Sequence, residues 1–149
     1  MKAFEFSLEK ILDLRKHFEN EAKIELGRAV SVLADLESRL YILGAERDRA
    51  AAAQFSSAND AALMQQYMYY LLRLDNEKET LLKETAIAEL KVEEARNAYL
   101  EASRDRKVLD KLKEKRQNEY FKKALSQEAI MLDDISSCAR AQNLIVDMA

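Results

Sequence analysis

The side chains best suited to chemistry in this 149-residue chain are a single histidine, His17, and a single cysteine, Cys138. One imidazole and one thiol cannot complete a tetrahedral zinc site or a Ser-His-Asp triad. The two glycines, Gly27 and Gly44, stand alone, so the chain lacks a glycine-rich loop that could hold a phosphate. We therefore expect no catalytic residue, no cofactor and no metal. On this reading the protein is not an enzyme, His17 lies on the surface and Cys138 is a partly buried apolar side chain.

A cluster of basic side chains lies between residues 104 and 116. Its members are Arg104, Arg106, Lys107, Lys111, Lys113, Lys115 and Arg116. Against Asp105, Asp110 and Glu114, they leave a net charge of +4 over these residues. The cluster is either a solvated helix face or a surface that attracts an acidic partner by its charge. Nucleic acid is the weaker option, because the cluster lacks interleaved aromatic residues and the chain from Ala124 onward is net acidic.

Three tyrosines, Tyr67, Tyr69 and Tyr70, fall within four residues. Neighbouring positions on a helix point about 100° apart, so these tyrosines cannot all face one partner helix. At least one must be exposed, and exposed tyrosine is typical of interface anchors. The alternative is that the tyrosines pack against the shoulder of their helix.

Two long helices must position these groups, because apolar residues recur alternately every four and three residues along two stretches. The first row is Leu8, Leu12, Arg15, Glu19, Ala22, Leu26, Ala29, Leu33, Leu36, Leu40 and Leu43. The second row is Met64, Tyr67, Leu71, Leu74, Lys78, Leu81, Thr85, Ala88, Val92, Ala95, Tyr99, Ala102, Arg106 and Leu109. Most positions in both rows are apolar, which is the heptad spacing that holds one helix against another.

The composition agrees with long helices. The sequence has no proline and only two glycines, and turns depend on those residues. Charged residues make up 34% of the chain with a formal net charge of −3, a mixture that argues against a nucleic-acid binder. No apolar run is long enough to span a membrane, and the first residues lack the apolar core of a signal peptide. A lone cysteine fits a reducing compartment, so we expect a cytoplasmic protein without membrane insertion.

The predicted fold class is all-α: a long antiparallel two-helix coiled-coil hairpin whose second helix is longer than the first. We expect a single domain over residues 1–149. Its predicted segments are a helix at about 7–53, a bend at about 54–59, a helix at about 60–136 and a frayed tail at 137–149.

Local signals support these boundaries. The bend falls on the only stretch of small polar residues in the middle of the chain, where Ser57 and Asp60 resemble a capping box. Ser7 can cap the first helix, and Phe6 can pack on Ile11 as a hydrophobic staple.

The second helix should extend beyond the point where the first helix begins. A bend centred near residue 56 pairs position i with about 112 minus i, which places Leu8 opposite Arg104. The second row then continues through charged positions, where the first helix should have ended: Lys113, Arg116, Tyr120 and Lys123. A further row follows without an expected partner inside the chain: Phe121, Leu125, Glu128, Leu132, Ile135 and Ala139. This last row either docks on another protein or belongs to a frayed end.

Two blocks of sequence resemble one protein family. The opening run from Phe4 to Lys16 (FEFSLEKILDLRK), continued by Glu21–Leu26 (EAKIEL), resembles the start of FliJ, the small flagellar export protein. The run from Tyr99 through Arg106–Arg116 (RKVLDKLKEKR) to Tyr120 resembles the C-terminal half of that family. The resemblance covers nearly the whole chain.

The resemblance implies a non-enzymatic stalk of the flagellar type III export apparatus, at the cytoplasmic face of the flagellar base. FliJ-like proteins form an antiparallel hairpin, bind the hexameric export ATPase, promote its assembly and contact the membrane export gate. The implied partners are therefore the ATPase with its regulator, the gate and export chaperones, with the protein monomeric when alone. The ATPase region would be Phe4, Phe6 and Arg15 with the basic cluster at 104–116. The gate region, near the bend, would be Leu40, Leu43, Arg47, Tyr67, Tyr69 and Tyr70.

Other functions fit the same pattern of residues. The chain could be the equivalent stalk of an injectisome or a vacuolar-type ATPase, or a chaperone-like escort that holds clients on its unpartnered row. It could also be a structural scaffold, which would form a parallel dimeric coiled coil without a bend.

Overall fold

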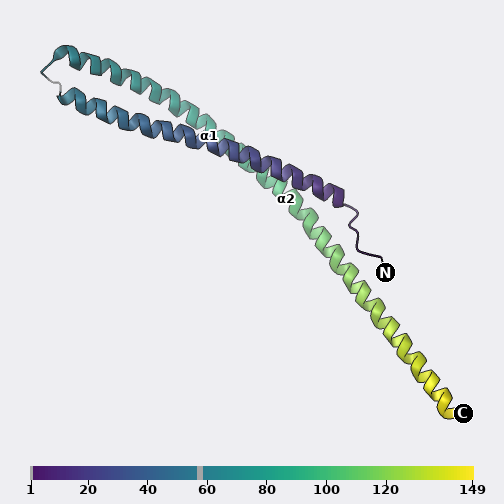
Figure 1. The fold of residues 1–149 in the computed structure, drawn as a ribbon. Helices are drawn as coiled ribbons and strands as arrows, with labels where there is room; N and C mark the ends of the chain where they lie inside the picture. Colours follow the sequence, from purple (N-terminus) through teal and green to yellow (C-terminus); the bar gives the residue numbers. More distant parts are fainter. Residues whose placement is uncertain (1, 57–58) are drawn as a thin grey trace. The chain divides into compact units, whose positions relative to one another are not determined.

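The computed structural model describes residues 2–56 and 59–149 and consists of two helices. Helix α1 covers Glu9–Ser56 and helix α2 covers Ala61–Met148 (Figure 1). Helix accounts for 93% of the described residues, which include no strand. The predicted all-α hairpin with a longer second helix is therefore confirmed. A parallel coiled coil without a bend, as the scaffold alternative requires, is wrong.

The described chain forms two compact units, Lys16–Ser103 and Met1–Arg15 with Arg104–Ala149. Each helix crosses from one unit into the other. The prediction of a single domain stays a prediction, and the two units are described in turn.

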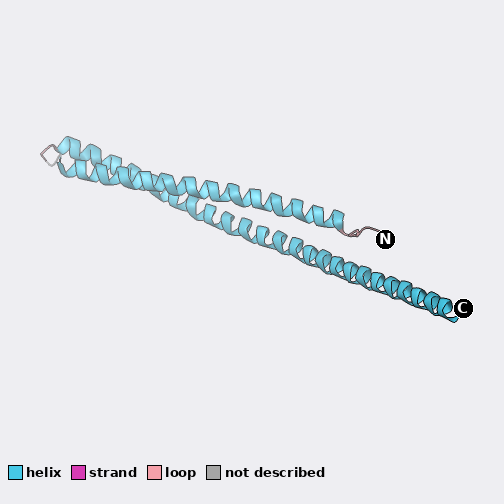
Figure 2. Cartoon of the chain, turned by 60° about the horizontal axis from the view of Figure 1, so that its bottom comes forward, coloured by secondary structure: helices cyan, strands magenta, loops and turns pink. Residues whose placement is uncertain are grey.

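The unit Lys16–Ser103 is a hairpin in which α1 and α2 run side by side in opposite directions (Figures 1 and 2). Its best-buried cluster is formed by Leu43, Ala50 and Leu74, against which Tyr70 and Leu81 pack. All positions of the first predicted row are buried or half-buried, and so are those of the second row except Lys78. The heptad rows therefore identified the faces that meet.

The link between the helices is shorter than predicted. Helix α1 continues to Ser56 and α2 begins at Ala61, whereas the bend was expected at about 54–59. The Asp60 carboxylate accepts hydrogen bonds from the backbone N–H groups of Ala62 and Leu63, at 3.1 and 3.2 Å. Asp60 is thus the N-cap of α2, where a carboxylate also faces the positive end of the helix dipole. Ser57, the other member of the expected capping box, lies outside the described residues.

In the second unit, a non-helical arm precedes α1. This arm, residues 2–8, lies against α2, and Glu9 donates its backbone N–H to the Phe6 carbonyl at 3.1 Å where the helix begins. Phe6 is buried, with the Arg116 guanidinium carbon 5.7 Å from its ring centre. Arg116 also donates a hydrogen bond to the Ser7 hydroxyl at 3.0 Å. Ile11, the expected staple partner, remains 45% exposed.

The predicted pairing of residues in this unit is wrong by two to three helical turns. The rule placed Leu8 opposite Arg104, whereas the adjacent Glu9 forms an ion pair with Lys113 at 2.8 Å. Arg15 likewise pairs with Asp105 at 3.0 Å. The bend lies later in the chain than assumed, and the same shift is present in the hairpin, where Arg47 pairs with Asp75 although the rule gives residue 65. The charged positions of the second row therefore mark where the arm docks.

The predicted end of the second helix near residue 136 is also wrong, because α2 runs to Met148. Nothing after Lys123 interrupts a helix, since the segment has no glycine or proline. Every residue from Leu125 to Ala149 is exposed. In the described part of the chain, no helix is both long and apolar enough to cross a membrane.

Candidate functional site

The two side chains first considered for chemistry both lie at the surface. His17 is exposed, as expected, and its Nε2 lies 3.0 Å from the Glu21 carboxylate one turn further along α1. Cys138 is an exposed free thiol on the last part of α2, so the expectation that it is partly buried is wrong. Within residues 2–56 and 59–149, no three His, Cys, Asp or Glu side chains are grouped to hold a metal ion.

The side chains of the predicted ATPase region fall into two classes: those that hold the arm or the start of α1 in place, and those that are exposed. Aromatic side chains belong to the first class. Phe4 packs on Tyr120 with ring centres 5.6 Å apart, and the Tyr120 hydroxyl donates to the Lys2 carbonyl. Together with the contacts of Phe6 and Arg116, these hold the arm on α2. Tyr120, the anchor of the arm, is not among the predicted site residues, although the aromatic residues at positions 4 and 6 gave a signal for it.

Three members of the basic cluster form ion pairs or hydrogen bonds within this unit or hold the arm. Lys113 pairs with Glu9, Arg116 contacts Ser7 and Phe6, and Arg106 pairs with Asp110 one turn along α2. Arg15, from the N-terminal part of the predicted region, pairs with Asp105. These side chains fix the arm and the start of α1, so they are not free to serve a partner without breaking those contacts.

The remaining four basic side chains share one face of α2. They are Arg104, Lys107, Lys111 and Lys115, which we call the outer basic stripe. Their spacing of three, four and four residues aligns them along the helix. All four are exposed, and within the described residues none forms an ion pair. Such a stripe can recognise a row of carboxylates on another protein.

At the hairpin end, most residues of the predicted gate region are buried in the seam between the helices or bonded to other residues of the hairpin. Leu43 is buried, and Leu40 and Tyr67 are half-buried in the helix seam. The Arg47 guanidinium donates to the Asp75 carboxylate at 2.6 Å. That hydrogen bond lowers the pKa of Asp75 and raises the pKa of Arg47.

Two of the three tyrosines differ sharply in environment. The Tyr70 hydroxyl donates to Glu46 on α1, and this hydrogen bond raises the pKa of Tyr70. Tyr69 is 60% exposed, which confirms that at least one tyrosine faces solvent. Met68 and Leu72 beside it are exposed as well, at 56% and 58%. These two residues are not among the predicted site residues, although they are apolar and lie outside the heptad row.

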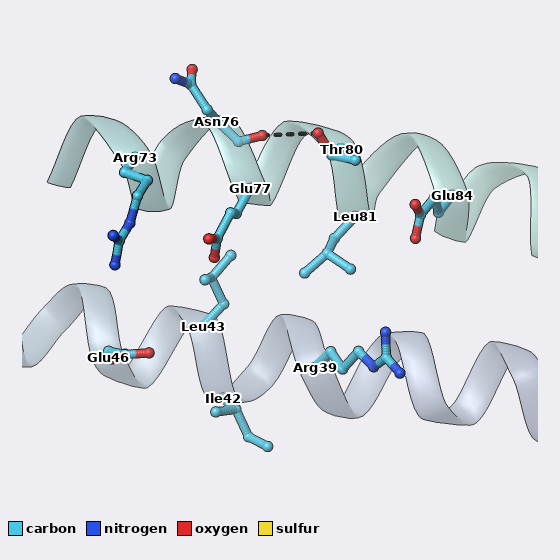
Figure 3. A pocket seen from close by; sticks show the side chains of 10 residues that line it. All are labelled: Arg39, Ile42, Leu43, Glu46, Arg73, Asn76, Glu77, Thr80, Leu81 and Glu84. Atoms are coloured by element: carbon cyan, nitrogen blue, oxygen red, sulfur yellow. Dashed lines mark hydrogen bonds between the residues drawn. The ribbon is translucent and has the colours of Figure 1, made fainter. Parts of the chain in front are cut away.

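A groove of about 590 Å³ lies between α1 and α2 in the hairpin (Figure 3). Ile42, Leu43 and Leu81 give it an apolar part, and Ile42 is 58% exposed. Charged and polar side chains from both helices complete the lining: Arg39, Glu46, Arg73, Asn76, Glu77, Thr80 and Glu84. An apolar groove with charged borders between two helices suits the apolar face of a third helix.

Comparison with known proteins assigns the chain to a family. The family model described as "Flagellar FliJ protein" matches residues 4–144. The chain belongs to the FliJ family. Neither the search of curated proteins nor the search of solved structures found a match.

Membership in the FliJ family confirms the resemblance drawn from the two sequence blocks. It makes the chain a protein of flagellar export, a structural or export component of a family not known for enzymatic activity. The arm from Phe4 onward, the outer basic stripe and the hairpin groove lie within the matched residues.

Proposed function

We propose that this chain is a non-enzymatic stalk component of the flagellar type III export apparatus. It binds the hexameric export ATPase, together with its regulator, and promotes the assembly or activity of the ATPase. It also links the ATPase to the membrane export gate at the cytoplasmic face of the flagellar base. The family assignment supports the setting, and the residues described above support the contacts.

The outer basic stripe is the observation that carries ATPase binding. The four cations of the outer basic stripe, which form no ion pair within the described residues, can steer association with an acidic surface and add contacts once the partner is bound. The docked arm stiffens the same stretch of α2, because Phe6, Glu9 and Ser7 hold Arg116 and Lys113 in place. A stiff, prearranged charge row loses less entropy on binding.

The test reverses charge on the stripe without touching the arm. Lys107→Glu/Lys111→Glu should reduce stimulation of the cognate hexameric ATPase by about threefold to tenfold, and the loss should shrink at high salt. Arg106 is left unchanged because it pairs with Asp110. Stimulation is measured as phosphate release against stalk concentration.

A matched control reverses two exposed lysines elsewhere on α2. Lys83→Glu/Lys91→Glu changes the net charge equally but lies in the hairpin unit. It should stimulate the ATPase as the wild type does. Equal loss in both variants would mean that net charge matters and the stripe does not; no loss in either would reject the stripe as the binding surface.

For the hairpin end, we propose two surfaces. Tyr69, with Met68 and Leu72, supplies exposed apolar contacts for the export gate. The groove at Ile42 accepts an amphipathic helix of an export chaperone. This revises the predicted gate region, since Leu43, Arg47 and Tyr70 are engaged within the hairpin.

These two surfaces predict opposite selectivity. Tyr69→Ala should weaken binding of the gate's cytoplasmic domain and leave chaperone binding intact, whereas Ile42→Glu should do the reverse. Calorimetric titration of each purified partner measures both affinities. Tyr41→Ala, at a residue that is 81% exposed outside the groove and the Tyr69 patch, is the control and should change neither. If either Tyr69→Ala or Ile42→Glu weakened the binding of both partners, the two surfaces would be a single binding surface.

A further inference from the structure

The end of the hairpin where α1 and α2 are joined is almost free of charge (Figure 1). Residues 50–72 contain one charged residue, Asp60, whereas charged residues make up 34% of the whole chain. We call the described part of this segment, residues 50–56 and 59–72, the tip. A helical hairpin in water normally carries charge on its exposed faces, so the tip is built for other surroundings.

Exposed apolar side chains surround the tip instead of following one face. Phe55, at the end of α1, is 84% exposed. On α2, Leu63 and Leu72 are 38% and 58% exposed, and they point about 180° apart because a helix turns by about 100° per residue. Met68 and Tyr69 point in two further directions and are 56% and 60% exposed. A partner protein on one face would leave the other faces in water, whereas a medium that encloses the tip would cover them all.

We propose that the tip inserts into the interfacial layer of a lipid bilayer. This layer accepts apolar and aromatic side chains, and the hydrocarbon beneath it penalises charge. An insertion of about 10 Å takes in about seven residues at the end of each helix, which includes Phe55 and Leu63. Tyr69 lies farther from the bend, where its ring and hydroxyl suit the level of the headgroups.

The polar groups of the tip are compatible with this layer. The Asp60 carboxylate accepts hydrogen bonds from the backbone N–H groups of Ala62 and Leu63 at 3.1 and 3.2 Å, so its charge faces the positive end of the α2 dipole. The other polar side chains at the ends of the two helices are uncharged amides and hydroxyls, which can hydrogen-bond to headgroups and water: Gln54, Ser56, Asn59, Gln65 and Gln66.

The first charged residue beyond the tip is an arginine on both helices, Arg49 on α1 and Arg73 on α2, and both are exposed. Arg47 pairs with Asp75, two residues farther from the bend on each helix, so Arg49 and Arg73 lie at one level of the antiparallel hairpin. The Arg73 guanidinium carbon is 5.2 Å from the ring centre of Tyr70. From this level, a long arginine side chain can reach toward lipid phosphates while its stem lies along the helix.

Acidic residues near the arginines limit the part that charge plays. Asp75 is paired with Arg47, and Glu46 accepts the hydrogen bond of Tyr70, but Asp48 is exposed beside Arg49. The net charge at this level is therefore small. Apolar insertion supplies most of the affinity, and binding should depend only weakly on the charge of the lipid.

Insertion of the tip is compatible with the surfaces proposed above and does not depend on the export function. Met68, Tyr69 and Leu72 lie farther from the bend than Leu63, so a gate contact there leaves Phe55 and Leu63 free to insert. The expectation of no membrane insertion rested on the lack of a long apolar run and concerned helices that span a membrane. The contact proposed here is shallow.

Flotation of the full chain with protein-free vesicles tests the proposal. The wild type should float with vesicles of phosphatidylethanolamine and phosphatidylglycerol, and its partition coefficient should fall by less than about threefold with phosphatidylcholine. Phe55→Ser/Leu63→Ser should lower the partition coefficient by about tenfold to a hundredfold, because apolar area sets the affinity. The matched control, Ile87→Ser/Leu90→Ser, removes residues that are 55% and 66% exposed on α2 outside the tip and should float like the wild type.

A fluorescent label tests which part of the chain enters the bilayer. In a Cys138→Ala background, an environment-sensitive dye on Phe55→Cys should shift to the blue when vesicles are added, and the same dye on Leu90→Cys should not. A wild-type chain that floats with neither kind of vesicle would overturn the proposal, as would equal flotation of the two double variants or equal dye shifts at both positions. Loss of binding to the gate's cytoplasmic domain in Phe55→Ser/Leu63→Ser, without flotation of the wild type, would make the tip a protein interface instead.

Discussion

Basic residues that are neighbours in the sequence have different roles in the structure. Arg116 holds the N-terminal arm on α2 and Lys113 holds the start of α1, whereas Lys107 and Lys111 project from another side of the same helix without an ion pair in the described residues. At about 100° per residue, Lys111 and Lys113 point about 160° apart and Lys107 and Arg116 about 180° apart, so the position of a charge in the sequence does not show what the side chain contacts. Only the side chains without a partner in their own unit are left to recognise another protein.

The Arg47–Asp75 pair gives a pH-dependent prediction at the residue scale. Arg47 lowers the pKa of Asp75 below its ordinary value of 3.8, so the carboxylate stabilises the folded hairpin above the unfolded-state pKa. This contribution is lost as pH falls through the lowered folded-state pKa. Asp75→Asn should therefore be less stable than wild type near about pH 6 and approach it toward about pH 2. Urea unfolding followed by circular dichroism at a series of pH values measures this.

The control for that series is Asp13→Asn, at an exposed carboxylate on α1 that forms no ion pair in the described residues. Its stability should follow the wild-type pH dependence. A stability difference between Asp75→Asn and wild type that is constant across pH would show that the ion pair does not stabilise the hairpin.

Each helix presents buried and exposed leucines within two residues of each other. Leu74 is 2% exposed in the hairpin core, while Leu72 is 58% exposed on the same helix. The difference follows from the heptad row, because Leu74 lies on it and Leu72 does not. Burial in a two-helix seam is shallow, so a few such residues carry much of the stability of the hairpin.

This contrast predicts the effect of truncating each leucine. Leu74→Ala should lower the free energy of unfolding by about 2 kcal/mol, the lower end for a buried leucine, since a thin seam lets neighbours and water fill the space. Leu72→Ala should change it by less than about 0.5 kcal/mol. Chemical denaturation monitored at 222 nm compares the two. Equal losses would place the two side chains in similar environments and contradict the assigned seam.

Over the whole molecule, charge is distributed unevenly along the chain. The formal net charge is −3, but residues 104–116 contribute +4, so the rest of the chain carries −7. The basic segment belongs to the unit that contains the docked arm, and the hairpin unit holds the groove and Tyr69. A protein with two distinct surfaces of this kind fits a linker between partners of different chemistry, as proposed for a member of the FliJ family.

The sequence by itself determined the helical class, the faces that meet and the family. Those properties depend on local composition and on a period of seven, both of which are written in the chain. The tertiary structure decided the pairing of distant residues: Glu9 meets Lys113 because a late bend shifts the register of the two helices. It also decided that Arg116 holds the arm and Lys113 the start of α1, while Lys107 and Lys111 form no ion pair within the described residues. A heptad repeat matches itself equally well after a shift of seven, so its spacing alone cannot select one register among several.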